Sequence, residues 1–163
     1  TGAGSTPHGD MTLDIVDGLV QEDSLRISWK KGHESQFYWQ ADVPADFSQM
    51  EQDGGALVME FMINKYPKGS VTQRMDCGWP CRGEIDVTEF YKSIPLRQRS
   101  KVGISLSCFK KMGVDMEKIT SPLVLVSKDE FEITFSDVRV IANASEDNTI
   151  KLCDSEVATL LQD

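Results

Sequence analysis

The sequence predicts an all-β fold, an antiparallel sandwich of two sheets with eight to ten strands and short helices in the connections. Three observations support this prediction. Apolar and polar residues alternate along six stretches, and a period of two residues is typical of strands with one buried face. Glycine, proline and aspartate interrupt the chain at the spacing of short sandwich strands. Windows compatible with a helix are few and short.

The alternation also predicts which side chains face the core. After Phe135 the apolar residues resume at Val138 and Val140, one position out of register. A β-bulge supplies one extra residue of this kind, so we expect a bulge at residues 136–137. The inward rows that we expect are Leu25–Ile27–Trp29, Phe37–Trp39, Leu57–Met59–Phe61–Ile63, Val71–Gln73–Met75–Cys77, Val102–Ile104–Leu106–Cys108 and Phe131–Ile133–Phe135.

Short helices and the ends of the chain complete the expected organisation. Three windows tolerate a helix, at residues 88–93, 110–119 and 154–161. The chain begins with Thr1 and continues through glycine, serine and proline, which is typical of a linker cut from a longer chain. We therefore expect residues 1–10 to be a linker, residues 11–142 to form the sandwich, and residues 143–163 to be an acidic tail.

The charge balance argues against several classes of partner. The 163 residues include 17 Lys and Arg against 26 Asp and Glu, which gives a net charge of -9. Nucleic acids and anionic membranes are bound mainly by clustered basic residues, so we expect neither as a partner. No apolar run reaches the roughly 20 residues that cross a bilayer. Histidine occurs only at His8 and His33, which leaves few candidates for general bases or metal ligands.

The most specific local motif is CGWPC at residues 77–81. A glycine and a proline between the cysteines suit a tight hairpin turn, whose strand ends lie about 4.5–5.5 Å apart. A disulfide spans that distance, so Cys77 and Cys81 are candidate partners, with Cys108 as the competing partner. The alternative is that these thiols are unpaired. A disulfide indicates an oxidising, extracytoplasmic compartment.

The same loop offers a candidate surface for carbohydrate binding. Trp79 lies at its apex, where burial is difficult, and an outward tryptophan is a flat apolar platform for a sugar ring. Tyr66 is a second aromatic residue in a loop. The alternative is that Trp79 folds over a sheet edge and that the nearby charges form a solvated face with weak ion pairs. Charged residues that suit hydrogen bonds to vicinal hydroxyls flank the loop, and they are Arg74, Asp76, Arg82, Glu84 and Asp86. The binding candidates among them are Arg74, Arg82, Glu84 and Asp86.

The candidate catalytic groups do not form a catalytic arrangement. Glu84 and Asp86 lie two residues apart on one strand, about 6.5–7 Å, which is within the separation used by inverting glycosidases. Their carboxylates nevertheless point the same way, whereas an acid and a base must flank the bond. A serine triad has no nucleophile elbow here. We therefore expect this chain alone not to be an enzyme and to need no cofactor. Candidate ligands for a structural calcium, without EF-hand spacing, are Asp42, Asp46, Asp53 and Asp137.

Three stretches carry a resemblance to a known family. They are MDCGWPCRGEIDVT at 75–88, ISLSCF at 104–109 with GVDMEKI at 113–119 and PLVL at 122–125, and FSDVRV at 135–140. Over residues 13–142 the chain resembles the extra C-terminal domain of bacterial family 3 glycoside hydrolases of the exo-1,3/1,4-β-glucanase type. The resemblance implies a jelly-roll, galactose-binding-like sandwich, similar to carbohydrate-binding modules. In one departure, residues 97–100 stand where the family usually has a tryptophan.

The resemblance implies a non-catalytic, carbohydrate-binding-like accessory domain of a β-glucan-degrading exo-glucanase or β-glucosidase. Its partners would be a β-glucan or glucooligosaccharide and the catalytic domains of the same parent chain, to which residues 1–10 lead. The parent enzyme would be periplasmic, on the outer surface or secreted. The alternative is a structural domain that packs on the catalytic core and shapes its substrate cleft without glycan affinity of its own. Its docking face would use the outward apolar residues Val58, Met62, Val124 and Val126.

Overall fold

The computed structural model describes residues 4–17, 23–144 and 150–151. This part of the chain contains three short helices, α1 (Ser48–Gln52), α2 (Thr88–Ser93) and α3 (Leu106–Lys111). Its strands are β1 (Gly4–Ser5), β2 (Met11–Val16), β3 (Ser24–Trp29), β4 (Ser35–Trp39), β5 (Ala56–Lys65), β6 (Val71–Asp76), β7 (Arg82–Asp86), β8 (Ser100–Ser105), β9 (Ser121–Ser127), β10 (Phe131–Ile141) and β11 (Ile150–Lys151).

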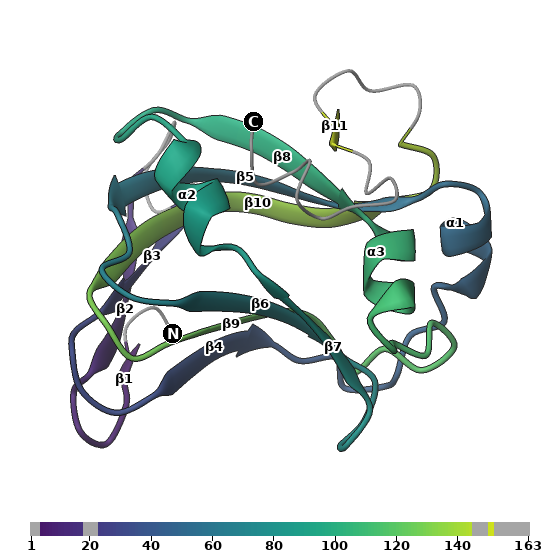
Figure 1. The fold of residues 1–163 in the computed structure, drawn as a ribbon, viewed down its shortest axis with the longest axis horizontal. Coiled ribbons are helices and arrows are strands. Elements are labelled where there is room, and N and C mark those ends of the chain that lie inside the picture. The colour runs from purple at the N-terminus through teal and green to yellow at the C-terminus, as the bar shows by residue number, and fades with distance from the viewer. Residues whose placement is uncertain (1–3, 18–22, 145–149, 152–163) are drawn as a thin grey trace.

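The strands form two sheets that pack face to face (Figure 1). The seven-stranded sheet has the order β1-β2-β3-β10-β5-β8-β11, and the four-stranded sheet has the order β4-β9-β6-β7. Neighbouring strands are antiparallel except β11, which pairs with β8 in parallel. The predicted antiparallel sandwich is therefore confirmed. Because strands β1 and β11 lie outside residues 11–142, the larger sheet extends into both ranges predicted as linker and tail.

The core lies between the two sheets and is rich in aromatic side chains. Trp29 is 2% exposed, stacks on Phe131 with ring centroids 5.4 Å apart, and donates its indole N–H to the backbone oxygen of Ser35 at 3.1 Å. Tyr91 of α2 lies edge-on to Phe61 at 5.6 Å. Burial raises the pKa of the Tyr91 hydroxyl above its usual range. These contacts confirm the inward faces predicted for β3, β5 and β10.

Strand β10 contains the predicted bulge. Phe135 pairs with Phe61 of β5, but the next pair joins Asp137 to Glu60, so Ser136 is the extra residue. The bulge returns Val138 to the inner face, where it packs against the core. The residues around the bulge, 135–138, also line a groove between the two sheets.

The helices differ from the prediction in two places. Helix α2 occupies the predicted residues, whereas the helix predicted at residues 110–119 is wrong. The strand predicted through Cys108 ends at Ser105, whose hydroxyl accepts the amide N–H of Ser107 at 3.3 Å and so caps α3. Helix α1 was not predicted, and the window at 154–161 lies outside the described residues. Within the described residues, no helix has the length and apolar character needed to span a membrane.

Two of the four residues in the apolar docking face predicted from sequence are covered, while Met62 and Val126 are partly buried. Val58 is fully buried and clusters with Ala56 and Ala144 on the outer side of the larger sheet. Val124 is also fully buried, although it lies on the outer side of the smaller sheet. The prediction that these two valines form an exposed docking face is therefore wrong.

Candidate functional site

The loop between β6 and β7 is closed by a disulfide. Cys77 is bonded to Cys81, with their Cα atoms 5.0 Å apart, so the structure does not pair Cys77 with Cys108. The amide of Cys77 donates to the oxygen of Cys81 at 3.0 Å, and the amide of Cys81 donates to the oxygen of Gly78 at 2.7 Å. Gly78 has a φ of +86°, a conformation that glycine adopts without strain. The turn is therefore held both covalently and by backbone hydrogen bonds.

A second set of hydrogen bonds ties this loop to the segment that precedes β9. The amide of Gly78 donates to the Thr120 hydroxyl at 3.2 Å, and the amide of Thr120 donates to the oxygen of Asp76 at 2.9 Å. The amide of Asp115 donates to Cys77 Sγ at 3.4 Å. With the loop anchored on this side, the side chain of Trp79 stays outside, and the residue is 82% exposed.

Removing the disulfide should destabilise the domain without abolishing its fold. We expect a Cys77→Ala/Cys81→Ala double variant to lose about 2 kcal/mol of unfolding free energy, since a short closed loop constrains the unfolded chain by about that amount. Urea denaturation followed by circular dichroism measures the loss. An unchanged denaturation midpoint would show that the strand pairing alone holds the turn.

One face of the Trp79 indole is covered by Arg82. The guanidinium carbon lies 4.8 Å from the ring centroid, which is cation–π distance. The Nε of Arg82 is in turn 3.1 Å from the Glu84 carboxylate, and both side chains are partly exposed. The predicted residues Trp79, Arg82 and Glu84 thus lie together, with Arg82 bound to the indole and to Glu84.

The outer face of the smaller sheet continues this surface across the strands. Tyr38, Val124, Arg74 and Glu84 are in register on β4, β9, β6 and β7. Arg74 binds the Asp76 carboxylate through Nε at 2.6 Å and through Nη2 at 3.1 Å. Its Nη2 also donates to Gln36 at 2.9 Å. Tyr38 is 50% exposed. It was not selected from the sequence as a binding residue, although it alternates with the inward Phe37 and Trp39 and was therefore expected to point outward.

Two of the predicted residues lie away from Trp79. Strand β6 separates Tyr66, which precedes it, from Trp79, which follows it, so the two aromatic residues are at opposite ends of the sandwich. The Tyr66 hydroxyl donates to the backbone oxygen of Ile94 at 2.7 Å, and its ring packs against the core. At the start of α2, the Asp86 carboxylate accepts a hydrogen bond from the amide of Thr88 at 2.9 Å and another from the Thr88 hydroxyl at 2.6 Å. The structure therefore gives Tyr66 and Asp86 local bonding roles.

A pocket of about 240 Å³ adjoins Trp79. It lies between the disulfide loop, the end of β4 and the start of β9. Its polar lining comes from Gln40, Asp76, Thr120 and Ser121. The sequence had placed Asp76 among the charged residues beside the loop, whereas Gln40, Thr120 and Ser121 were not selected from it as binding residues. Among the residues that the structure describes, no group of three or more His, Cys, Asp or Glu side chains is arranged to hold a metal ion.

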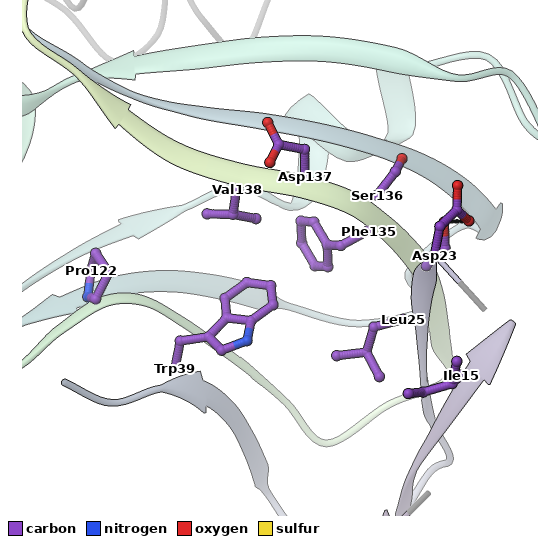
Figure 2. A pocket seen from close by; sticks show the side chains of 10 residues that line it. Ile15, Asp23, Leu25, Trp39, Pro122, Phe135, Ser136, Asp137 and Val138 are labelled. Carbon is purple, nitrogen blue, oxygen red and sulfur yellow. Dashed lines mark hydrogen bonds between the residues drawn. The ribbon is translucent and has the colours of Figure 1, made fainter. Parts of the chain in front are cut away.

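A larger groove of about 570 Å³ opens at a corner between the two sheets (Figure 2). Sandwich sheets cross at about 30°, so their corners diverge and leave inner residues uncovered. Figure 2 shows Phe135 and Val138 pointing towards Trp39 and Leu25, while Asp137 points away from them. Trp39 lies edge-on to Phe135, with ring centroids 5.7 Å apart. Sequence analysis placed Trp39 in the core, but it is only partly buried and forms one wall of this apolar groove.

Comparison with known proteins agrees with this architecture. The family model named Exop_C, described as galactose-binding domain-like, matches residues 1–140. The chain belongs to this family. The domain is similar in structure to the extra C-terminal domain of exo-1,3/1,4-β-glucanase (ExoP) from a Pseudoalteromonas species, with a TM-score of 0.74 and 15% identity over 94% of this chain and 83% of that chain. No curated protein matches the sequence.

Two further solved structures show the same fold. The whole ExoP enzyme aligns with a TM-score of 0.76 and 16% identity, over 94% of this chain and 18% of the enzyme chain. The family 30 carbohydrate-binding module of the cellulosomal cellulase Cel9D-Cel44B from Clostridium thermocellum aligns with a TM-score of 0.65 and 20% identity, over 90% of this chain and 92% of that chain. The resemblance recognised in the sequence is thus confirmed as a galactose-binding-like domain similar to the extra domain of ExoP.

Proposed function

We propose that this chain is a non-catalytic carbohydrate-binding domain of an extracytoplasmic β-glucan-degrading enzyme, an exo-glucanase or β-glucosidase of glycoside hydrolase family 3. The observation that carries the proposal is the exposed indole of Trp79 on a loop closed by a disulfide. The family membership and the similarity to a carbohydrate-binding module support it. The disulfide supports a site outside the cytoplasm, where such bonds persist.

The binding mechanism is stacking combined with hydrogen bonds. The open face of the Trp79 indole covers the apolar C–H face of a pyranose ring, and its fixed position reduces the entropy lost on binding. Charged side chains around it are paired with one another, as in Arg74–Asp76 and Arg82–Glu84, so the surface suits a neutral, hydroxyl-rich ligand. Bond cleavage belongs to the catalytic domains of the parent chain, because Glu84 and Asp86 project from the same face of β7.

Affinity electrophoresis tests this function directly. The purified domain is run in native gels that contain laminarin or mixed-linkage glucan, beside gels without polysaccharide. We expect retarded migration in at least one glucan gel relative to a non-binding reference protein. Equal migration in all gels contradicts glycan binding. Release of reducing ends from the glucan by the domain alone contradicts its non-catalytic role.

The groove at Trp39 favours a second candidate function, docking on the catalytic domains without glycan affinity. Its wall residues Leu25, Trp39 and Val138 are apolar and only partly buried, as are interface anchor sites. In this case an apolar side chain of the catalytic domains would enter the groove. The covered valines Val58 and Val124 would take no part.

A charged substitution in the groove separates the two functions. If the groove docks the catalytic domains, Leu25→Glu should weaken co-elution of the domain with them by about tenfold or more, since a charge buried in an apolar contact is unpaired. Under this second function, neither the unchanged domain nor Leu25→Glu should be retained in laminarin gels. Leu96→Glu, at a partly exposed leucine outside the groove, is the matched control. Equal co-elution of both variants contradicts docking through the groove.

A further inference from the structure

The pocket beside Trp79 combines three polar side chains that are far apart in sequence. Gln40 follows β4, Asp76 ends β6 and Thr120 precedes β9, and the sheet order β4-β9-β6 brings them to the same end of the smaller sheet. Gly78, Trp79 and Cys81 line the pocket on the loop side, and Ser121 lines it at the start of β9. Arg82, which covers one face of the indole, does not line this pocket. The Trp79 indole therefore contacts Arg82 and also forms part of the pocket wall.

The polar groups of the pocket have defined hydrogen-bonding capacity. Asp76 is held by two bonds from Arg74, which fix its carboxylate and leave further lone pairs for hydroxyl donors. The Thr120 hydroxyl accepts the Gly78 amide, and its own O–H remains a donor. Gln40 is exposed, and its amide both donates and accepts. Together the pocket offers acceptors and donors next to an aromatic surface.

We propose that this pocket is the specificity subsite of the domain, in which Gln40 and Asp76 bind the hydroxyls of a single neutral pyranose ring stacked on Trp79. The inference rests on the proposed function and assigns ligand contacts to residues on the Gln40 side of the loop. Arg82 then acts as a positioning residue, because it contacts the indole and does not line the pocket, and Glu84 in turn binds Arg82.

Size and charge define which ligand the subsite accepts. A volume of about 240 Å³ is below the range of about 300–1,000 Å³ usual for larger ligands, so the pocket suits one ring rather than two. Its lining includes the Asp76 carboxylate and no cationic side chain. A ring that bears a carboxylate would bring a second negative charge next to Asp76. The subsite therefore selects a neutral sugar over the corresponding uronate.

The three tryptophans allow a direct test by NMR. Each indole N–H gives its own signal, and the environments differ: Trp29 is buried, Trp39 lines the groove and Trp79 lines the pocket. The domain is titrated with laminaribiose, methyl β-glucoside and methyl β-glucuronide. We expect the Trp79 signal to shift with both neutral sugars while the Trp29 signal stays in place. The glucuronide should bind about tenfold or more weakly than the glucoside.

Two glutamines, one on β4 and one just after it, provide a matched pair of variants. Gln40→Ala should weaken laminaribiose binding about five- to tenfold, as expected for the loss of one good hydrogen bond. Gln36→Ala, which removes a bond to Arg74 outside the pocket, should change it less than about twofold. Asp76→Asn should weaken binding as Gln40→Ala does, and an unshifted Trp29 signal would show that the fold is intact.

The outcomes separate the subsite from the function on which it rests. If laminaribiose shifts the Trp79 signal but Gln40→Ala and Asp76→Asn bind like Gln36→Ala, the subsite is wrong and glycan binding at Trp79 stands. Equal binding of glucoside and glucuronide also overturns the subsite. If no neutral sugar shifts the Trp79 signal, both the subsite and the proposed function at Trp79 fail.

Discussion

Trp79→Ala is expected to reduce the migration shift of the domain in laminarin gels to that of a non-binding protein. A solvent-facing indole on a fixed loop is the kind of anchor whose truncation costs about 2 kcal/mol, or about 30-fold in affinity. The residue is 82% exposed, so the loss reflects ligand contact and not folding. The dissociation constant follows from gel series of increasing laminarin concentration.

A conservative variant and a distant variant control this measurement. Trp79→Phe keeps a smaller aromatic surface and should retain part of the affinity. Leu96→Ala, at another partly exposed apolar residue, should leave the migration shift unchanged. Full retention by Trp79→Ala would remove this residue from the binding site and leave the groove at Trp39 as the functional surface.

Trp29→Ala is expected to have the largest effect on stability. The side chain is 2% exposed, stacks on Phe131 and donates to Ser35, and truncating a buried aromatic residue costs about 3–5 kcal/mol. This is a large part of the stability of a domain of this size. Urea denaturation followed by far-ultraviolet circular dichroism gives the change in unfolding free energy.

The comparison of Trp29 with Trp79 tests the division between core and surface. Trp79→Ala should change the unfolding free energy by less than about 0.5 kcal/mol, as is usual for an exposed side chain outside special backbone positions. A loss as large as that of Trp29→Ala would mean that Trp79 supports the fold. Its role in binding would then have to be measured by a milder substitution.

Strand positions were predictable because one physical pattern determines them. The alternation from Leu57 to Ile63 reflects a single buried face, and the register slip after Phe135 indicated the bulge. Helix α3 was missed because Leu106 and Cys108 continue the alternation of β8. Both residues are buried in the helix as well, so burial alone does not distinguish the two conformations. The decisive contact is the cap made by Ser105, which is a weak signal in a strand-rich sequence.

The site was predictable only where it is local in sequence. The cysteine spacing placed Trp79 outward because the turn and its aromatic residue lie within one motif. Gln40 and Thr120 were missed since only the order of the strands brings them to the same pocket. Tyr66 was selected for its loop position, but its separation from Trp79 depends on the direction of β6. In each case, the pairing of strands that are distant in the chain determines which residues lie together, and a single sequence does not show that pairing.

The covalent closure of residues 77–81 makes the exposed tip of the loop largely independent of folding. Strand pairing of β6 with β7 and the bond between Cys77 and Cys81 fix both ends of the loop, so the residues between them contribute little to the sandwich itself. On the proposed function, exchanging the apex residue would then change the affinity for a glycan while the scaffold tolerates the change. Affinity in such a fold can be adjusted by point substitution at one exposed tip.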